Sequence, residues 1–164
     1  MDHSKFYARA RTLLVGAIAT AAVVVAADQA FAQGPKMTPG ERAVKYRQAV
    51  YTVLAGNFGP VNAMATGKAP MNAAELTKRS ERVAQIAKFL DEAFPPESNG
   101  VGNTDAKPEI WTNNAEFQKQ LTALVEKSDA LAAAAKTGDA AKIKSAAEET
   151  AGTCKSCHEK FMKD

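Results

Sequence analysis

The sequence predicts an all-α fold, an antiparallel up-down-up-down four-helix bundle. Three observations support this fold class. After residue 32 no stretch alternates apolar and polar residues as a half-buried strand does. Four stretches begin with helix-capping residues, and within these stretches apolar residues recur at spacings of three and four. Short connections join the first predicted helix to the second and the third to the fourth, which is typical of antiparallel neighbours.

Each predicted helix begins at a capping signal. Thr38 and Glu41 form a capping box, with proline at the first helical position. Asn72 begins the second helix, Asn113 the third, and Asp139 the fourth, after a Thr-Gly pair that closes the third. A long linker with two adjacent prolines separates the second helix from the third, and linkers of that length often carry function. The predicted helices span residues 39–65, 72–93, 113–136 and 139–162.

Inward-facing positions can be assigned on three of these helices from the repeat of the apolar residues. On the third helix they are Phe117, Leu121, Leu124, Ser128 and Leu131. On the fourth they are Ile143, Ala147, Thr150, Cys154, Cys157 and Phe161. On the first they are Val44, Arg47, Tyr51, Leu54, Phe58 and Val61. The fourth helix therefore points both cysteines of the chain into the predicted core.

The pentapeptide CKSCH at 154–158 predicts the attachment of one c-type haem. In a C-x-x-C-H motif each sulfur adds to one vinyl group of the porphyrin, and the imidazole reaches the iron. A structural zinc site needs about four ligands, but the chain has two cysteines and two histidines. A thioredoxin-like pair needs a βαβ pattern nearby. Helical Cβ atoms about 5–6 Å apart do not suit a disulfide, which needs about 3.5–4.5 Å. We expect Cys154 and Cys157 to bind the haem and His158 to bind its iron.

Residues 1–32 have the pattern of a cleaved secretory signal peptide. Basic residues precede an apolar run at 13–27, and Ala30 and Ala32 form a small-x-small cleavage site before Gln33. An uncleaved membrane anchor is the alternative, but the run is shorter than the about 20 residues of a spanning helix. Haem is joined to C-x-x-C-H outside the bacterial cytosol, so we expect a periplasmic protein without a membrane anchor.

The expected mature domain, residues 33–164, is nearly balanced in charge. Subtracting the three basic and two acidic residues of the signal from totals of 21 and 18 leaves 18 and 16, a net charge of +2. Nucleic-acid binding needs a one-sided basic patch, so no nucleic-acid partner is expected. The length suits one domain with one core.

Arg47 is a charged residue on an otherwise apolar helix face. Either its head reaches solvent along the core, or its planar guanidinium binds a haem propionate. In the predicted bundle the end of the fourth helix lies level with the start of the first, which brings Arg47 and Tyr51 to the haem and puts Tyr51 opposite His158. Met64 lies about 20 Å further along the axis and is expected to pack rather than bind iron. No strong protein ligand is therefore predicted at the sixth position.

These features resemble the cytochromes c′, class II c-type cytochromes with a C-terminal C-x-x-C-H in a four-helix bundle. The resemblance covers residues 38–164, and it implies that Arg47 and Gln48 contact the propionate side, that Asp105 lies near the haem edge and that Tyr51 is the distal residue. It also implies a homodimer. The family often has an arginine four residues after the haem histidine, where this chain has Met162. The resemblance rests on AVKYRQ at 43–48, FG at 58–59 with GKAP at 67–70, DAKPEIW at 105–111 and CKSCH at 154–158.

The distal residue distinguishes two functions within this resemblance. Low-spin members have a distal methionine and carry electrons, whereas high-spin members have an apolar or aromatic residue and an open site. Tyr51 favours a five-coordinate high-spin iron, bound by His158, that binds nitric oxide or carbon monoxide, with electron transfer as a second role. The alternative is a six-coordinate low-spin protein that acts purely as an electron carrier. We expect no enzyme, because peroxide chemistry generally needs a distal base and the mature chain has no second histidine.

Overall fold

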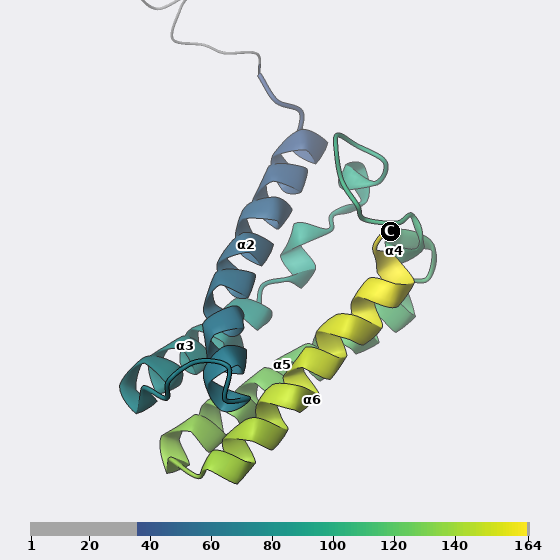
Figure 1. Cartoon of the computed structure of the whole chain (residues 1–164). Coiled ribbons are helices and arrows are strands. Elements are labelled where there is room, and N and C mark those ends of the chain that lie inside the picture. The colour runs from purple at the N-terminus through teal and green to yellow at the C-terminus, as the bar shows by residue number, and fades with distance from the viewer. Residues whose placement is uncertain (1–35, 164) are drawn as a thin grey trace, which may run out of the picture. The chain divides into compact units, whose positions relative to one another are not determined.

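The computed structural model describes residues 36–163, so the predicted signal peptide lies outside the described residues. Four long helices form the bundle, and the predicted all-α architecture is confirmed (Figure 1). Each long helix packs against the next in chain order and the last packs against the first, as an up-down-up-down bundle requires. The long helices are α2 (Pro39–Ala65), α3 (Ala73–Ala87), α5 (Asn114–Thr137) and α6 (Ala140–Phe161).

Side-chain caps fix the starts of three helices where the sequence predicts them. Thr38 Oγ1 accepts from the Glu41 amide at 3.2 Å, and the Glu41 carboxylate accepts in return from the Thr38 amide at 2.7 Å. Asn72 Oδ1 accepts from the third amide of α3 at 3.0 Å. Asp139 Oδ1 accepts from two amides at the start of α6, at 3.0 and 3.1 Å. Asn113 makes no such bond, because it also ends a one-turn helix, α4 (Glu109–Thr112), that the sequence analysis did not predict.

Helix α3 ends at Ala87, six residues before the predicted end. The amides of Lys88 and Phe89 bond to carbonyls three residues back, which tightens the last turn. The chain then continues through two short 3-10 helices, η1 (Asp91–Ala93) and η2 (Pro96–Ser98). Phe94 and Pro95 separate them, and Pro96 begins η2. A residue that precedes a proline is disfavoured in the α conformation, so neither Phe94 nor Pro95 continues a helix. The connection from α3 to α5 is therefore longer than predicted.

Two buried apolar clusters fill the bundle. The predicted inward positions of α5 are all buried, as are those of α6 apart from the half-buried cysteines. The cluster nearer the turn between α5 and α6 includes Val61, Leu131 and Met64. Met64 is 7% exposed, so its predicted packing role is confirmed. The other cluster contacts both cysteines and includes Leu54, Val83, Leu90, Ile110, Phe117, Leu121, Leu124 and Phe161. No helix among residues 36–163 is long and apolar enough to cross a membrane.

Candidate haem pocket

Two cavities lie between α2 and α6, at the end of the bundle that carries the C-terminus. Tyr51 and Ala55 of α2 line both cavities, and so do Cys157 and His158 of α6. The outer cavity, about 340 Å³, extends from these residues toward Arg47 and the linker before α4. The inner cavity, about 260 Å³, extends into the apolar core. Their shared walls make one hollow with a polar edge and an apolar depth.

Helix α6 brings the three residues of the haem motif to one wall of this hollow. Cys157 lines both cavities and Cys154 lines the inner one, and both thiols are half-buried and free. Burial raises the pKa of the Cys157 thiol to about 11 and raises that of Cys154 as well. His158 is exposed and its imidazole makes no hydrogen bond within residues 36–163, so both ring nitrogens are available to a metal.

Arg47 is 5% exposed, so the hypothesis that its head reaches solvent is wrong. Its Nη1 donates to the Ala93 carbonyl at 3.1 Å and to Ser98 Oγ at 3.3 Å. Its Nη2 donates to Thr104 Oγ1 at 3.1 Å. The guanidinium carbon lies 4.8 Å from the centre of the Phe94 ring. No carboxylate pairs with Arg47 in the described part of the chain, and a buried cation without a counter-ion favours an anionic ligand.

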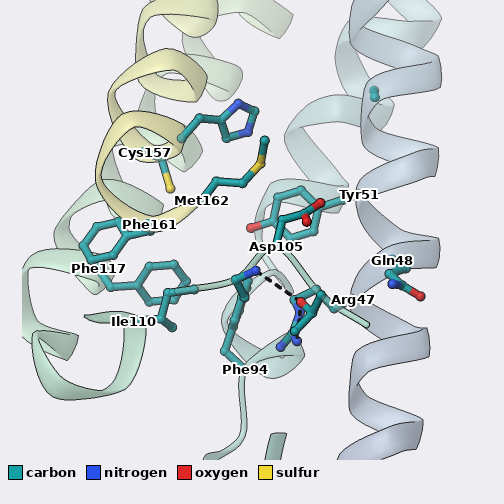
Figure 2. Close-up of a pocket in the computed structure, with 14 residues that line it drawn as sticks. Arg47, Gln48, Tyr51, Phe94, Asp105, Ile110, Phe117, Cys157, Phe161 and Met162 are labelled. Atoms are coloured by element: carbon teal, nitrogen blue, oxygen red, sulfur yellow. Dashed lines mark hydrogen bonds between the residues drawn. The ribbon is translucent and has the colours of Figure 1, made fainter. Parts of the chain in front are cut away.

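Tyr51 lies on the α2 wall, across the hollow from Cys157 (Figure 2). Its ring meets Phe94 edge-on, with the ring centres 6.1 Å apart. Burial is the main reason that the pKa of the Tyr51 phenol lies well above its ordinary value, and the two cysteines add to the rise. The nearby charge of Arg47 acts in the opposite direction. Tyr51 is therefore a neutral phenol at physiological pH.

The two remaining predicted residues lie at the polar edge. Gln48 is exposed, lines the outer cavity and donates through Nε2 to the Asn103 carbonyl at 2.9 Å. Asp105 is exposed and lines the same cavity. Met162 also lines it, from the α6 wall, where the family often has an arginine. A thioether donates no hydrogen bond, so this wall lacks the donor that an arginine would supply.

The sequence analysis missed Phe94 and Thr104. Both line the outer cavity and both contact Arg47. Phe94 also packs on Phe117 of the core, with ring centres 4.7 Å apart. They lie in the linker, outside any helical repeat, so no periodic signal marks them. Only the Asp105 to Trp111 part of the resemblance pointed to this region.

The residues present fit a haem. Two thiols at i and i+3 with a histidine next to the second are the attachment chemistry of haem c. The outer cavity alone lies in the range of about 300–1,000 Å³ that is common for cofactor sites. The apolar depth of the hollow formed by the two cavities suits a porphyrin. The guanidinium of Arg47 at the polar edge, which pairs with no carboxylate of the described residues, suits a propionate. Cys154, Cys157, His158 and Arg47 would hold the group.

Comparison with known proteins agrees with this fit. A family model described as Cytochrome C′ matches residues 42–162. Cytochrome c′ of Rubrivivax gelatinosus is 42% identical over 123 residues, which cover 75% of this chain and 95% of that protein. The solved structure of cytochrome c prime from Shewanella frigidimarina has a TM-score of 0.74 and 38% identity, and the match covers 79% of this chain and 100% of that one. A nitric oxide complex of a variant cytochrome c prime from Alcaligenes xylosoxidans has a TM-score of 0.71 and 32% identity, over 79% of this chain and 100% of that one. This chain therefore belongs to the cytochrome c′ family.

Proposed function

We propose that this protein is an exported cytochrome c′ that binds nitric oxide or carbon monoxide at an iron held by His158 and otherwise open. Membership of the family confirms the prediction of a covalently bound haem c. When bound, that group supplies an iron able to accept a neutral diatomic molecule. Cys154 and Cys157 attach it, and Arg47 with Gln48 holds its propionate edge while Asp105 lies beside it.

One observation carries the proposal of an open position. Five of the described residues that line the two cavities are of types that can ligate haem iron: Tyr51, Cys154, Cys157, His158 and Met162. The sulfurs of the two cysteines are used to attach the haem, and His158 and Met162 both come from the α6 wall. The α2 wall opposite presents Tyr51, a neutral phenol, and Ala55. Neither is a strong ligand. The nitric oxide complexes solved for the Alcaligenes xylosoxidans protein support the same ligand class.

Tyr51 is expected to control access to this position. Its ring occupies the space that an incoming ligand needs, so the competent state is only a fraction of the population and the apparent affinity falls by that fraction. Tyr51→Ala should therefore bind carbon monoxide faster and more tightly. Tyr51→Phe keeps the ring and removes the hydroxyl, and it should bind at the wild-type rate. If the hydroxyl instead donates a hydrogen bond to the ligand, Tyr51→Phe will release carbon monoxide faster.

The absorption spectrum of the reduced protein, with and without carbon monoxide, tests the proposal. A high-spin spectrum that changes on addition of carbon monoxide is expected. A ferrous protein that is already low-spin, and whose carbon monoxide kinetics do not change in Tyr51→Ala, would replace the proposal with the pure electron-carrier function.

Export and assembly complete the proposal. We expect cleavage before Gln33 and secretion to the periplasm, and intact mass spectrometry should give residues 33–164 plus one haem that acidic acetone does not extract. Tyr46 and Val53 on the outer face of α2 are 42% and 52% exposed, and an exposed apolar helix face favours a homodimer through α2. Sedimentation should show a dimer in the wild type and a monomer in Val53→Glu. A monomeric wild-type protein would refute the proposed homodimer and leave the rest of the proposal unaffected.

A further inference from the structure

The linker segment 104–107 connects the two walls of the haem pocket. On the α2 side, Thr104 Oγ1 accepts from Arg47 Nη2 at 3.1 Å. The same oxygen accepts from the Ala106 amide at 3.2 Å. A hydroxyl oxygen has two lone pairs, and both are used here. The Thr104 side chain is therefore fixed between the guanidinium and the linker backbone.

The same segment holds the end of α6. The Lys107 amide donates to the Phe161 carbonyl at 2.9 Å, and the Lys163 amide donates to the Asp105 carbonyl at 2.8 Å. Lys163 Nζ donates to the Thr104 carbonyl at 3.1 Å. Ala106 and Met162 form the isolated antiparallel bridge of the described chain. These bonds begin three residues after His158, within one helical turn of the predicted iron ligand.

Direct packing between the two walls is limited. The α2–α6 pair has the smallest contact of the four neighbouring pairs in the bundle. The two helices diverge toward the end that carries the C-terminus (Figure 1). The bonds through residues 104–107 therefore tie α2 to α6 where direct helix packing is weakest.

We propose that Thr104 is a positioning residue of the haem pocket. Its hydroxyl holds Arg47 on the α2 wall, and its carbonyl, together with residues 105–107, holds the end of α6, so that the segment sets the spacing between Tyr51 and His158. This role rests on the proposed function, because those residues are the distal and axial residues of the proposed site. Loss of the hydroxyl removes the link from Arg47 to this segment and so weakens the connection between the two walls.

Two substitutions at Thr104 separate the hydroxyl from the shape of the side chain. Thr104→Val keeps the branched shape and removes the acceptor. Thr104→Ser keeps the acceptor. Thr122→Val is the matched control, because the Thr122 hydroxyl donates only to a carbonyl of its own helix, α5, on an exposed surface.

Amide hydrogen exchange of the haem-loaded protein, followed in peptides that cover Lys107 and Lys163, measures how firmly segment 104–107 is bonded to the end of α6. We expect exchange at least about tenfold faster in Thr104→Val, because a hydrogen bond to a charged group is lost and the segment opens locally. Thr104→Ser and Thr122→Val should exchange at the wild-type rate. The reduction potential and the carbon monoxide association rate should change in Thr104→Val and recover in Thr104→Ser, which a general loss of stability would not produce.

Lys163→Met tests the tie from the α6 side without altering Thr104. It should speed exchange in the same two peptides, and it also serves if Thr104→Val does not fold. Wild-type exchange in Thr104→Val, or equal exchange in Thr104→Val and Thr104→Ser, would overturn the positioning role. Exchange does not depend on ligand binding, so a protein that shows the exchange pattern but binds no carbon monoxide would refute the proposed function and leave the tie intact.

Discussion

Replacement of Arg47 by methionine tests the assignment of this residue to the propionate edge. Methionine keeps an unbranched apolar stem of similar reach and removes the charge and all donors. The guanidinium is buried, and its hydrogen-bond partners are the Ala93 carbonyl, Ser98 Oγ and Thr104 Oγ1. We expect a loss of stability together with a lower reduction potential.

The size of the stability loss follows from the hydrogen-bond partners of Arg47 that Arg47→Met leaves unpaired. Ser98 Oγ still donates to the Pro95 carbonyl, and Thr104 Oγ1 still accepts from Ala106. The Ala93 carbonyl, in a fully buried residue, loses its partner, at a cost of about 1–3 kcal/mol. The lost contact with the Phe94 ring adds about 0.5–2 kcal/mol. A propionate left without its cation raises the cost further, to about 4 kcal/mol or more.

Denaturant unfolding of the haem-loaded protein and redox titration together form the assay. A fixed positive charge disfavours ferric iron, so its removal should lower the potential. For an assumed separation of about 15 Å between the charge and the iron and an effective dielectric constant of about 20, the interaction is about 1 kcal/mol, or about 50 mV for one electron. Arg79→Met on α3 is the control. Arg79 pairs with Glu75 at 2.6 Å and lines neither cavity, and a partly exposed pair contributes below about 1 kcal/mol.

An Arg47→Met protein with an unchanged potential and a stability loss no larger than that of Arg79→Met would refute the reasoning. Arg47 would then have neither the supporting role in the linker nor the role at the haem edge. An unchanged potential together with the larger stability loss would leave Arg47 as a support of the linker only.

The remaining predictions concern pH and packing. The raised pKa of Tyr51 means that above about pH 10, the ordinary value for tyrosine, the unfolded chain releases this proton before the folded one, so stability falls as pH rises. Over a range of about one pH unit either side of that value, the denaturation midpoint should fall less in Tyr51→Phe than in the wild type. The control Tyr46→Phe should behave as wild type. In Gly40→Ala the new Cβ would lie 2.3 Å from the Glu97 carbonyl oxygen, so we expect a loss of about 1–3 kcal/mol. In Gly152→Ala the new Cβ meets no atom within 4 Å, so this variant should gain up to about 1 kcal/mol in the same unfolding assay. Equal effects of the two substitutions would contradict the close approach of Gly40 to the Glu97 carbonyl.

Local signals in the sequence determined most of the bundle. The capping box at Thr38, the cap at Asp139 and the inward positions of α5 and α6 all depend on residues three or four apart, and helix geometry alone brings such residues together. The same geometry places Cys154, Cys157 and His158 on one helix, and their chemistry predicts the cofactor. These inferences need no knowledge of the rest of the chain.

Tertiary structure decided what Arg47 contacts. The sequence left its head either in solvent or at a propionate, and its actual partners, Ala93, Ser98 and Thr104, lie 46, 51 and 57 residues away in the chain. The linker that supplies them has no helical repeat, so nothing in the sequence predicts which of its carbonyls and hydroxyls meet the guanidinium. The early end of α3 and the extra turn of α4 likewise depend on how this linker packs over the end of the bundle. Periodic elements are fixed by neighbours within one turn, whereas an irregular segment is fixed only by the surfaces it finds once the helices have assembled.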